Sequence, residues 1–254
     1  MSCKFDYIIL DIESYLIKAC FACVALKEIS EGTYCEVYEV ARGKAYLNDI
    51  IDGFKERIDG REIVIVVGDI ENNFRKKINP TYKHNRKGKP KIYDVLLSWL
   101  VDKYNVVFLK GVEADDTARI VFEDNDNFPG EKVIVSVDKD FYSVPCNFYR
   151  DNPNGGEVVT VTEEDARQNL FVQILTGDKA DGYSGCKGVG PITACSLVNS
   201  ETTVNDVKQI FIDNGMEAES FETNLMMAHI LGIKNYNLKT NRIKHKNKKG
   251  EYVL

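Results

Sequence analysis

The sequence predicts an α/β fold, in which a central, mostly parallel sheet is flanked by helices and followed by a C-terminal helical lobe. Short runs rich in Val and Ile, at Tyr7–Leu10, Ile63–Val67 and Val133–Val137, are typical of buried parallel strands. Segments with helical spacing separate these runs, and such alternation favours a parallel sheet. From about Thr162 only helical patterns follow. We therefore expect a core over residues 1–161 and a lobe over residues 162–254.

The elements expected in the core follow from the spacing of apolar residues. Leu47, Ile51 and Phe54, for example, lie at helical intervals and predict an amphipathic helix. In order, we predict strand Phe5–Leu10, helix Ile12–Glu28, edge strand Tyr34–Val40, helix Gly43–Asp59, strand Ile63–Val67, helix Tyr93–Tyr104, strand Val106–Leu109, helix Ala114–Phe122, strand Val133–Val137, and short strands Asn147–Tyr149 and Val158–Val161.

The elements of the lobe are predicted from capping and turn signals. Thr162–Asp165 has the pattern of a capping box, and it opens a helix that runs to Leu175. A glycine-rich turn follows, and further helices are expected near Thr203–Asp213 and Phe221–Leu231. The tail beyond them is polar and basic.

Acidic residues follow the predicted core strands. Asp11 comes directly after the first strand, Asp69 after the second strand and a glycine, and Asp138 after the third, with Asp140 two residues on. The carboxyl ends of parallel strands meet at one edge of a sheet, where ligands bind. Like charges repel one another there unless a cation is present. A further acidic group opens the predicted helix at Ala114, and its members are Glu113, Asp115 and Asp116.

The stretch Ile174–Val198 combines an acidic pair with a glycine-rich turn. Asp178 and Asp181 are spaced i,i+3, so on a helical turn both point the same way. Three glycines within Gly185–Gly190 then lead into Pro191 and an apolar helix. Glycines permit close backbone approach, and a helix N-terminus directs free N–H groups at an anion. A phosphate-binding turn beside acids indicates a nuclease that holds its substrate next to its metal ions.

The distribution of charge supports a nucleic-acid substrate, although the net charge of −6 argues against one. From Asn72 to Tyr93 there are eight basic residues and no acid, and from Thr223 to Gly250 there are seven and again no acid. The acids concentrate between Glu113 and Asp181. Two basic surfaces beside an acidic centre suit a phosphodiester.

The acids also fit the chemistry of phosphodiester hydrolysis, which needs an activated water and relief of charge on the phosphoryl oxygens. Two metal ions about 4 Å apart supply both. Mg²⁺ keeps waters and takes few protein carboxylates, so two ions need several acids around a gap. No set of His and Cys residues suits zinc, and no G-x-x-x-x-G-K-[ST] loop is present.

Each of these features has a plainer interpretation when it is taken alone. A single Asp after a strand is more often an N-cap or a turn residue. The acids at Glu113–Asp116 favour a helix N-terminus, Gly188-Val189-Gly190 resembles many turns, and a basic loop can be a solvated surface. The ordered combination is specific where its parts are not.

Five sequence blocks carry a resemblance to a known family. The blocks are INPTYKHNRK at Ile78–Lys87, EADD at Glu113–Asp116, VIVSVDKDF at Val133–Phe141, GDKADGYSGCKGVG at Gly177–Gly190 and MAHILGIKNYN at Met227–Asn237. In these residues the chain resembles the 5′-nuclease superfamily, which includes flap endonucleases and the 5′ nuclease domain of bacterial DNA polymerase I. It is especially similar to the 5′→3′ exonucleases of short-tailed bacteriophages.

The resemblance implies a site and its ligands. The metal ligands, which are also catalytic, would be Asp11, Asp69, Glu113, Asp115, Asp116, Asp138, Asp140, Asp178 and Asp181. Two Mg²⁺ ions are expected, for which Mn²⁺ can substitute, together with K⁺ at a helix-hairpin-helix over Gly185–Ala194. The DNA contacts would be Arg75, Tyr82, Lys83, Arg86, Lys87, Gly185, Lys187, Gly188 and Gly190. The basic region 72–91 would form an arch, although it is short for a tall one.

Lys83 and Arg86 are the predicted basic catalytic residues. They are spaced i,i+3 in a region without acids, so neither has a local ion-pair partner, and a helical Thr81–Lys87 would point both to one side. With Tyr82 they would sit at the base of the arch against the scissile phosphate. There they would stabilise the charge that builds up on the phosphoryl oxygens.

The resulting functional hypothesis is a metal-dependent 5′→3′ exodeoxyribonuclease that acts on duplex DNA and on RNA primers in RNA–DNA hybrids during phage replication. A structure-specific flap endonuclease is the nearest alternative, with a nick or flap as substrate. A PIN-type ribonuclease shares the sheet and the acids but has no need of the glycine hairpin. A non-catalytic DNA-binding protein would need few of the nine acids. We expect a monomer.

The cysteines and the apolar runs indicate a protein of the cytoplasm, which for a phage protein is that of the host. The seven cysteines are an odd number, which fits a reducing compartment. Cys20 and Cys23 form a lone C-x-x-C pattern, best interpreted as two small buried side chains. No apolar run reaches the roughly 18 residues of a membrane span, and no signal peptide is visible.

Overall fold

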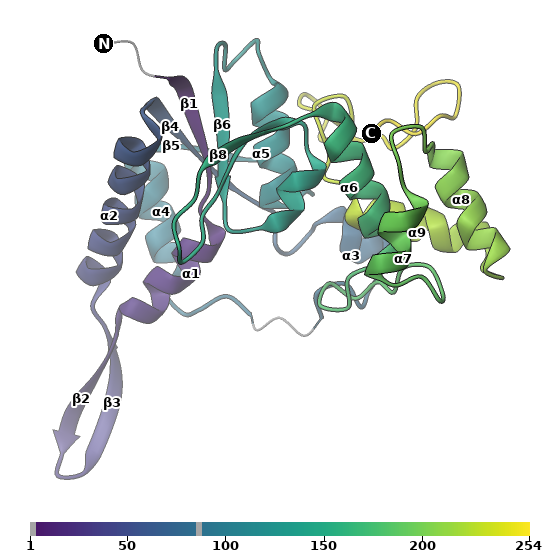
Figure 1. The fold of residues 1–254 in the computed structure, drawn as a ribbon. Coiled ribbons are helices and arrows are strands. Elements are labelled where there is room, and N and C mark those ends of the chain that lie inside the picture. Colours follow the sequence, from purple (N-terminus) through teal and green to yellow (C-terminus); the bar gives the residue numbers. More distant parts are fainter. Residues whose placement is uncertain (1–3, 85–87) are drawn as a thin grey trace.

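A mostly parallel sheet of six strands forms the centre of the part of the chain that the computed structural model describes, residues 4–84 and 88–254. Across the sheet the strands are β5 (Asn105–Phe108), β4 (Gly60–Val67), β1 (Phe5–Asp11), β6 (Lys132–Ser136), β7 (Cys146–Arg150) and β8 (Val158–Val161). In this sheet only β8 runs antiparallel to its neighbour. The predicted fold class is confirmed, and Figure 1 shows helices on both sides of the sheet.

Helices cover both faces of the sheet because successive strand residues point to opposite faces. Ile8 packs among α1 (Glu13–Ala22), α2 (Val40–Ile58) and α4 (Tyr93–Lys103), whereas its neighbour Ile9 packs on the side of α5 (Ala114–Glu123). Both isoleucines are fully buried, and each such side chain contributes roughly 1.5–3 kcal/mol. This two-sided burial explains why the core strands are continuous apolar runs. Within residues 4–84 and 88–254, none of the helices combines the length and apolarity needed to cross a bilayer.

The strand register aligns the carboxyl ends of the core strands at one edge of the sheet. Leu10 of β1 lies beside Ile65 of β4 and Val135 of β6, and Ser136 lies beside Arg150 of β7. The residues that follow these positions therefore share one edge, which we call the carboxyl edge. It is the lower edge of the sheet in Figure 1.

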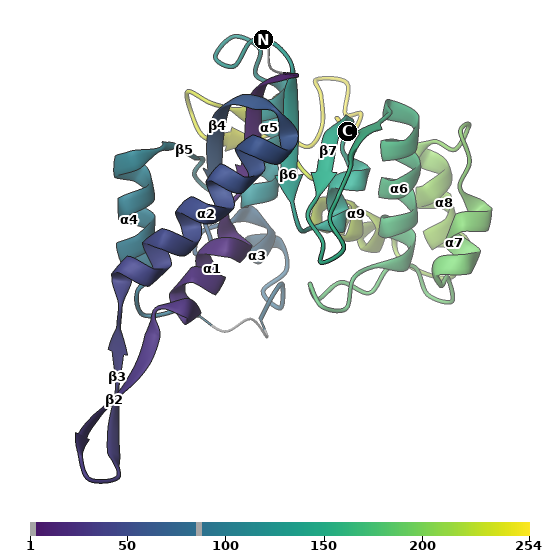
Figure 2. The same ribbon diagram turned by 60° about the vertical axis from the view of Figure 1, so that its left-hand side comes forward.

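The first connection differs from the prediction. The helix expected over Ile12–Glu28 ends at Ala22, and a hairpin of β2 (Val24–Ser30) and β3 (Thr33–Tyr38) follows. Gly32 at its tip has φ +74°, a conformation that favours glycine. The strand expected at Tyr34–Val40 thus pairs with β2 and not with the main sheet. Figures 1 and 2 show this ribbon projecting from the body beyond the carboxyl edge.

Cys20 and Cys23 are packing residues, as their small size suggested. Both are free thiols buried between α1, α2 and the sheet. A side chain added at Gly43 of α2 would clash with the Cys23 sulfur, so the two helices touch there. Burial raises the pKa of the Cys20 thiol to about 11, which keeps it protonated at neutral pH.

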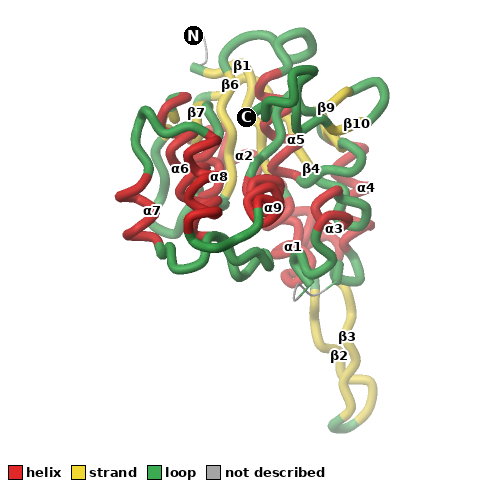
Figure 3. The backbone as a smooth tube through the Cα atoms, turned by 90° about the vertical axis from the view of Figure 1, so that its right-hand side faces the viewer, coloured by secondary structure: helices red, strands yellow, loops and turns green. Residues whose placement is uncertain are grey.

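The C-terminal lobe is helical, as predicted. Its helices are α6 (Glu163–Thr176), α7 (Pro191–Leu197), α8 (Val204–Asp213) and α9 (Ala218–Ala228), and Thr162 caps α6 by accepting a hydrogen bond from the Asp165 N–H. Beyond α9 the chain returns to the core, because Leu231 and Tyr236 pack against Phe74 and Ile120. The tail forms the small pair β9 (Tyr236–Asn237) and β10 (Arg242–Ile243), and Figure 3 shows α9 with α8 of the lobe on one side of it and α3 (Phe74–Ile78) of the core on the other.

Candidate active site at the carboxyl edge of the sheet

Asp11, the last residue of β1, lies at the centre of the carboxyl edge. Its Oδ2 accepts a hydrogen bond of 2.9 Å from Ser136 Oγ at the end of β6. The same Ser136 oxygen accepts the Asp138 N–H at 3.1 Å, so one hydroxyl links the two strand ends. Burial and then the neighbouring Glu13 raise the pKa of Asp11 to about 7, with a smaller contribution from Asp138. The site therefore crowds negative charge around this carboxyl.

Asp138 and Asp140 are held by a short 3₁₀ helix, η1 (Lys139–Ser143), that follows β6. Asp138 is its N-cap, and its Oδ1 accepts the Asp140 N–H at 2.9 Å. Burial and the charge of Asp138 raise the pKa of Asp140 to about 6. We call Asp11, Asp138 and Asp140 the β1–β6 group. For Asp11 and Asp140, burial and other acids outweigh the groups that lower the pKa, which include the Ser136 hydroxyl, Lys139 and Gln173.

Asp178 and Asp181 approach this group from the lobe, but in a turn and not in a helix. Asp178 and Tyr183 exchange backbone hydrogen bonds of 2.9 and 3.0 Å, which close the turn. Asp178 Oδ1 accepts the N–H groups of Ala180 and Asp181. The predicted helical turn is therefore wrong, since the aspartate side chain competes for the backbone donors that a helix would use. Asp178 still lies near enough to contribute to the raised pKa of Asp140.

Lys83 connects the basic region to the acids. Its Nζ lies 2.8 Å from Glu113 Oε1 and 3.7 Å from Asp181 Oδ2, and its side chain is 14% exposed. Lys83 has no ion-pair partner close to it in the sequence, as predicted, but the fold brings Glu113 and Asp181 to it from distant parts of the chain. Lys83 also has φ +52° in a turn and not in a helix, a strained conformation for a residue with a side chain. Arg86 and Lys87 lie outside the described residues.

Tyr82 supports Glu113 from the protein interior. Its hydroxyl donates a 2.7 Å hydrogen bond to Glu113 Oε2, and the residue is only 3% exposed. A direct DNA contact by this side chain is therefore wrong for the described structure. Burial opposes ionisation of Glu113, but Lys83 and Arg75 hold its pKa below the usual range.

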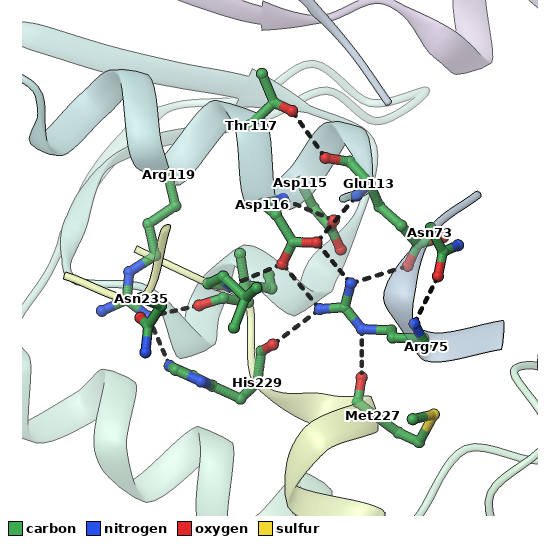
Figure 4. A network of polar contacts seen from close by, with 12 residues as sticks. Asn73, Arg75, Glu113, Asp115, Asp116, Thr117, Arg119, Met227, His229 and Asn235 are labelled. Carbon is green, nitrogen blue, oxygen red and sulfur yellow. Dashed lines mark hydrogen bonds and ion pairs between the residues drawn. The ribbon is translucent and has the colours of Figure 1, made fainter. Parts of the chain in front are cut away.

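Arg75 and Asp116 form a buried ion pair behind the site, as Figure 4 shows. Arg75 Nη1 and Nη2 donate to the two Asp116 oxygens at 2.6 and 2.9 Å. The guanidinium also donates to the carbonyls of Met227 and His229 at the end of α9. The Leu231 N–H donates another hydrogen bond, of 2.8 Å, to Asp116 Oδ1.

Two predicted roles are contradicted by this network. Arg75 is 1% exposed with every nitrogen engaged by the protein, so it cannot contact DNA. Asp116 is fully buried and both its oxygens accept protein donors, so it is not a metal ligand as it stands. The pair ties α3 (Phe74–Ile78) and α5 to α9, and sequence alone could not distinguish such an acid from a metal ligand.

Asp115 completes what we call the α5 group, with Glu113 and Asp116. Burial and the adjacent Asp116 raise the pKa of Asp115 well above its usual range, against the influence of Arg75. Its Oδ1 accepts the Asp116 N–H at 2.7 Å. Asp115 is thus the member of the α5 group whose charge is least balanced.

Asp69 fixes two loops at the end of β4. Its Oδ1 accepts from the backbone and side chain of Asn72, and its Oδ2 accepts the Gly111 N–H at 3.0 Å. Burial works against ionisation, but these hydrogen bonds lower its pKa. These hydrogen bonds explain the position of Asp69 by its role in holding the two loops, and they require no metal ion.

The structure thus gathers six of the nine predicted acids into two groups that flank the Asp178–Asp181 turn, and Asp69 stands apart at the end of β4. Among residues 4–84 and 88–254, no three His, Cys, Asp or Glu side chains lie close enough together to hold a metal ion as they stand. Two further residues belong to the site. Ser136 bridges Asp11 and the Asp138 backbone, and Glu13 accepts the Gly68 N–H at 2.9 Å. The Asp11–Glu13 spacing, which repeats that of Asp138–Asp140, was the available signal for Glu13.

The glycine turn of the lobe has two kinds of glycine. Gly185 has φ +68°, and a Cβ there would clash with the Thr176 and Leu175 backbone. Gly190, the N-cap of α7, has φ −89° and open space where its Cβ would be. Ile192 in the first turn of α7 is 89% exposed, and Lys187 is exposed nearby. The fold therefore requires glycine at Gly185 but leaves Gly190 facing solvent.

Comparison with known proteins identifies the family. A model of the 5′-3′ exonuclease N-terminal resolvase-like domain matches residues 6–147, which carry strands β1, β4, β5 and β6 and most of the acids. The chain belongs to the 5′-3′ exonuclease family.

Family relatives include phage enzymes and bacterial nucleases. The exodeoxyribonuclease of Enterobacteria phage T3 is 31% identical over 179 residues, which cover 67% of this chain and 58% of the relative. The exonuclease of Escherichia phage T7 is 33% identical over 169 residues, 63% of this chain and 55% of the relative. The flap endonuclease Xni of Shewanella sp. strain MR-4 is 28% identical over 56% of this chain and 59% of the relative. The chain thus spans somewhat more than half the length of these relatives.

Solved structures show that the family fold is shared. The T5 D15 protein co-crystallised with metal ions superposes with a TM-score of 0.63 at 17% identity, over 87% of this chain and 88% of that one. The catalytic core of Rad2 in complex with a DNA substrate gives a TM-score of 0.51 at 15% identity, over 98% of this chain and 75% of that one. These likenesses establish the 5′-nuclease fold for the chain.

Proposed function

We propose that the protein is a metal-dependent 5′→3′ exodeoxyribonuclease that hydrolyses phosphodiester bonds from the 5′ end of duplex DNA. The observation that carries the proposal is the β1–β6 group. Asp11 and Asp140 have pKa values raised to about 7 and about 6, by burial and by the acids around them. Acids held together in this way are stabilised by a cation. Because the chain belongs to a family of exonucleases, we assign that cation to catalysis.

The donor set fits Mg²⁺. The candidate ligands are carboxylates without histidine or cysteine, which suits a hard cation that retains part of its water shell. We assign the ligands to the β1–β6 group, Glu113, Asp115, Asp178 and Asp181, with Mn²⁺ as a substitute for Mg²⁺. Bound in a pair, such ions activate a water and neutralise charge on the phosphoryl group. A solved T5 5′-exonuclease contains bound divalent zinc, which supports a divalent-ion site in this fold.

The protein's own residues supply orientation and charge. Lys83 lies between Glu113 and Asp181, so its ammonium group is placed to approach a phosphate held at these acids. Tyr82 and Arg75 fix the Glu113 carboxylate from behind. The exposed backbone around Gly188 and Gly190 is suited to a duplex phosphate, with K⁺ as an additional ligand there. We also assign DNA contacts to Arg86 and Lys87, in the same basic region as Lys83.

Duplex DNA with a 5′ end or nick is the proposed partner, and an RNA–DNA hybrid is a further substrate. The T3 and T7 relatives are named for exonuclease activity, and solved relatives include a T5 D15 pseudo-enzyme–product complex with DNA and metal ions. We propose that the enzyme acts as a monomer in the cytoplasm of the host. Flap cleavage is the second candidate activity, because the Shewanella relatives are named flap endonucleases.

The test is Mg²⁺-dependent release of a 5′ label from blunt, nicked and flapped duplexes of one sequence, with EDTA as the metal-free control. Short products from blunt and nicked DNA are expected. Cleavage confined to the base of a flap would favour the endonuclease. Binding of all three substrates without Mg²⁺-dependent cleavage would indicate a DNA-binding protein and overturn the proposal.

A further inference from the structure

A polar cavity lies beside the carboxyl edge, next to the end of β7. It has a volume of about 390 Å³ and lies between η1 and the connection from β7 to β8. Its lining includes Tyr142, Arg150, Asn152, Asn154, Gly156 and Glu157. Tyr142 belongs to the same 3₁₀ helix as Asp140, so the cavity adjoins the acids within one element.

Arg150 is the reason to regard this cavity as a binding site. It ends β7 beside Ser136, the residue that hydrogen-bonds Asp11. Its guanidinium makes no ion pair or side-chain hydrogen bond with the described residues, and its buried Nε has no partner. A buried donor without a partner costs about 1–3 kcal/mol. The other described arginines without a partner, Arg61 and Arg242, are exposed and have no such cost.

The acids near Arg150 are engaged elsewhere or stand apart from it. Asp151 accepts a 2.7 Å hydrogen bond from Tyr15 on α1, and alternation along the chain directs it to the other face of the sheet. Asp140 interacts with Asp138 and Gln173. Glu157 lines the cavity but forms no ion pair with Arg150 within the described part of the chain. The guanidinium is therefore available to an anionic ligand.

Tyr142 adds an aromatic surface to the same cavity. It is 36% exposed, and its ring is held edge-on by Phe148, with centroids 5.2 Å apart and planes at 84°. An aromatic ring that is fixed but accessible can stack on a nucleobase, and a guanidinium binds phosphate through paired N–H groups. These two groups side by side suit one nucleotide unit of a strand.

We propose that this cavity is a nucleotide subsite, in which Arg150 binds a phosphodiester of the substrate strand close to the scissile one and Tyr142 stacks on the attached base. The inference rests on the proposed nuclease function and extends it. Because the ligand is an anion, Glu157 at the same cavity weakens binding by like-charge repulsion. Arg150 and Glu157 therefore have opposite effects on affinity.

The experiment measures binding of a 3′-fluorescent duplex by anisotropy in EDTA, which separates affinity from cleavage. Arg150→Ala is expected to weaken binding about 10-fold, as for one lost charge-assisted hydrogen bond, and to lower the salt slope by about one. Arg150→Lys should be intermediate, and Glu157→Gln should bind more tightly than the wild type. Arg61→Ala, which removes an exposed arginine at the amino end of β4, is the matched control and should bind normally.

A scan with single methylphosphonates near the 5′ end then locates the contact. For the wild type, a methylphosphonate at one position should weaken binding, and the same substitution should not weaken binding by Arg150→Ala. Tyr142→Ala should bind the unmodified duplex more weakly than the wild type, with the same salt slope. Normal binding by Arg150→Ala, or weaker binding by Glu157→Gln, would overturn the subsite. Neither result affects the proposed nuclease activity, which fails separately if the wild type shows no Mg²⁺-dependent cleavage.

Discussion

The two groups of acids at the carboxyl edge differ in how their charge is balanced. In the α5 group, Arg75 pairs with Asp116 and Lys83 pairs with Glu113. In the β1–β6 group, the donors to Asp11 and Asp138 are a hydroxyl and backbone N–H groups. The pKa of Glu113 is accordingly lowered, whereas burial and neighbouring acids raise the pKa values of Asp11 and Asp140. The comparison indicates that protein cations balance Glu113 and Asp116, whereas Asp115 and the β1–β6 group have less protein charge to balance them and depend more on metal ions.

The largest expected effects come from removing one charge from each group. Asp138→Asn should lower turnover by about 10³-fold with little loss of duplex affinity, and should leave stability unchanged or improved, since it relieves repulsion. Asp116→Asn should instead destabilise the fold by about 3–5 kcal/mol, since it leaves buried Arg75 without its counter-charge. Chemical unfolding of both variants measures the change in stability, and single-turnover cleavage measures the change in rate. A stable Asp116→Asn variant, or an unstable Asp138→Asn one, would reverse the assignment.

Lys83→Ala tests whether the lysine between the groups acts in catalysis as well as in balancing Glu113. The single-turnover rate at saturating enzyme should fall by at least ~10²-fold, because the ammonium group is needed most when charge builds on the phosphate. Lys248→Ala, in the exposed basic tail, should change only affinity and its salt dependence. Recovery of the normal rate at saturation would make Lys83 an electrostatic guide. Arg86→Ala is predicted to behave like Lys83→Ala.

The glycine turn offers a pair of variants with opposite consequences. Gly185→Ala should lower the free energy of unfolding, because the new Cβ meets the backbone of α6 and φ is positive. Gly190→Ala should fold normally but bind duplex several-fold more weakly, since its open space is where a phosphate would approach. Anisotropy with duplex and with a short single strand distinguishes the effects. Equal binding of duplex by Gly190→Ala and the wild type would remove this turn from the interface.

Stability in metal-free buffer should depend on pH through the β1–β6 group. Asp11 has a pKa of about 7 in the folded state against an ordinary value of 3.8, so between these values the folded state binds more protons than the unfolded state. The stabilisation is complete below pH 3.8 and is lost as pH rises through about 7, by at most about 1.4 kcal/mol per unit. Urea unfolding should show a flatter profile for Asp11→Asn over this range. An unchanged profile would mean that Asp11 ionises normally.

The sequence predicts what is local and misses what is formed by distant residues. Continuous apolar runs identify β1, β4 and β6, and the acids that follow them reach the carboxyl edge because the strands are parallel. Nothing in the sequence indicates the hairpin, and its pattern predicts a single helix over Ile12–Glu28. Val24–Ser30 is exposed on a two-stranded ribbon, so it lacks the alternation of apolar and polar residues that marks a half-buried strand. The pairing of Arg75 with Asp116 joins residues 41 positions apart, so the spacing of residues gave no sign of it.

The most direct test of the account is the response of the unfolding temperature to Mg²⁺. Wild-type protein should be stabilised by increasing Mg²⁺, because the folded state binds the ion and the unfolded chain does not. Asp138→Asn should show a much smaller response. Glu131→Gln, at an exposed position just before the amino end of β6, should respond like the wild type. If Asp138→Asn is stabilised as strongly as the wild type, the β1–β6 group does not bind the metal ions and the central claim is contradicted.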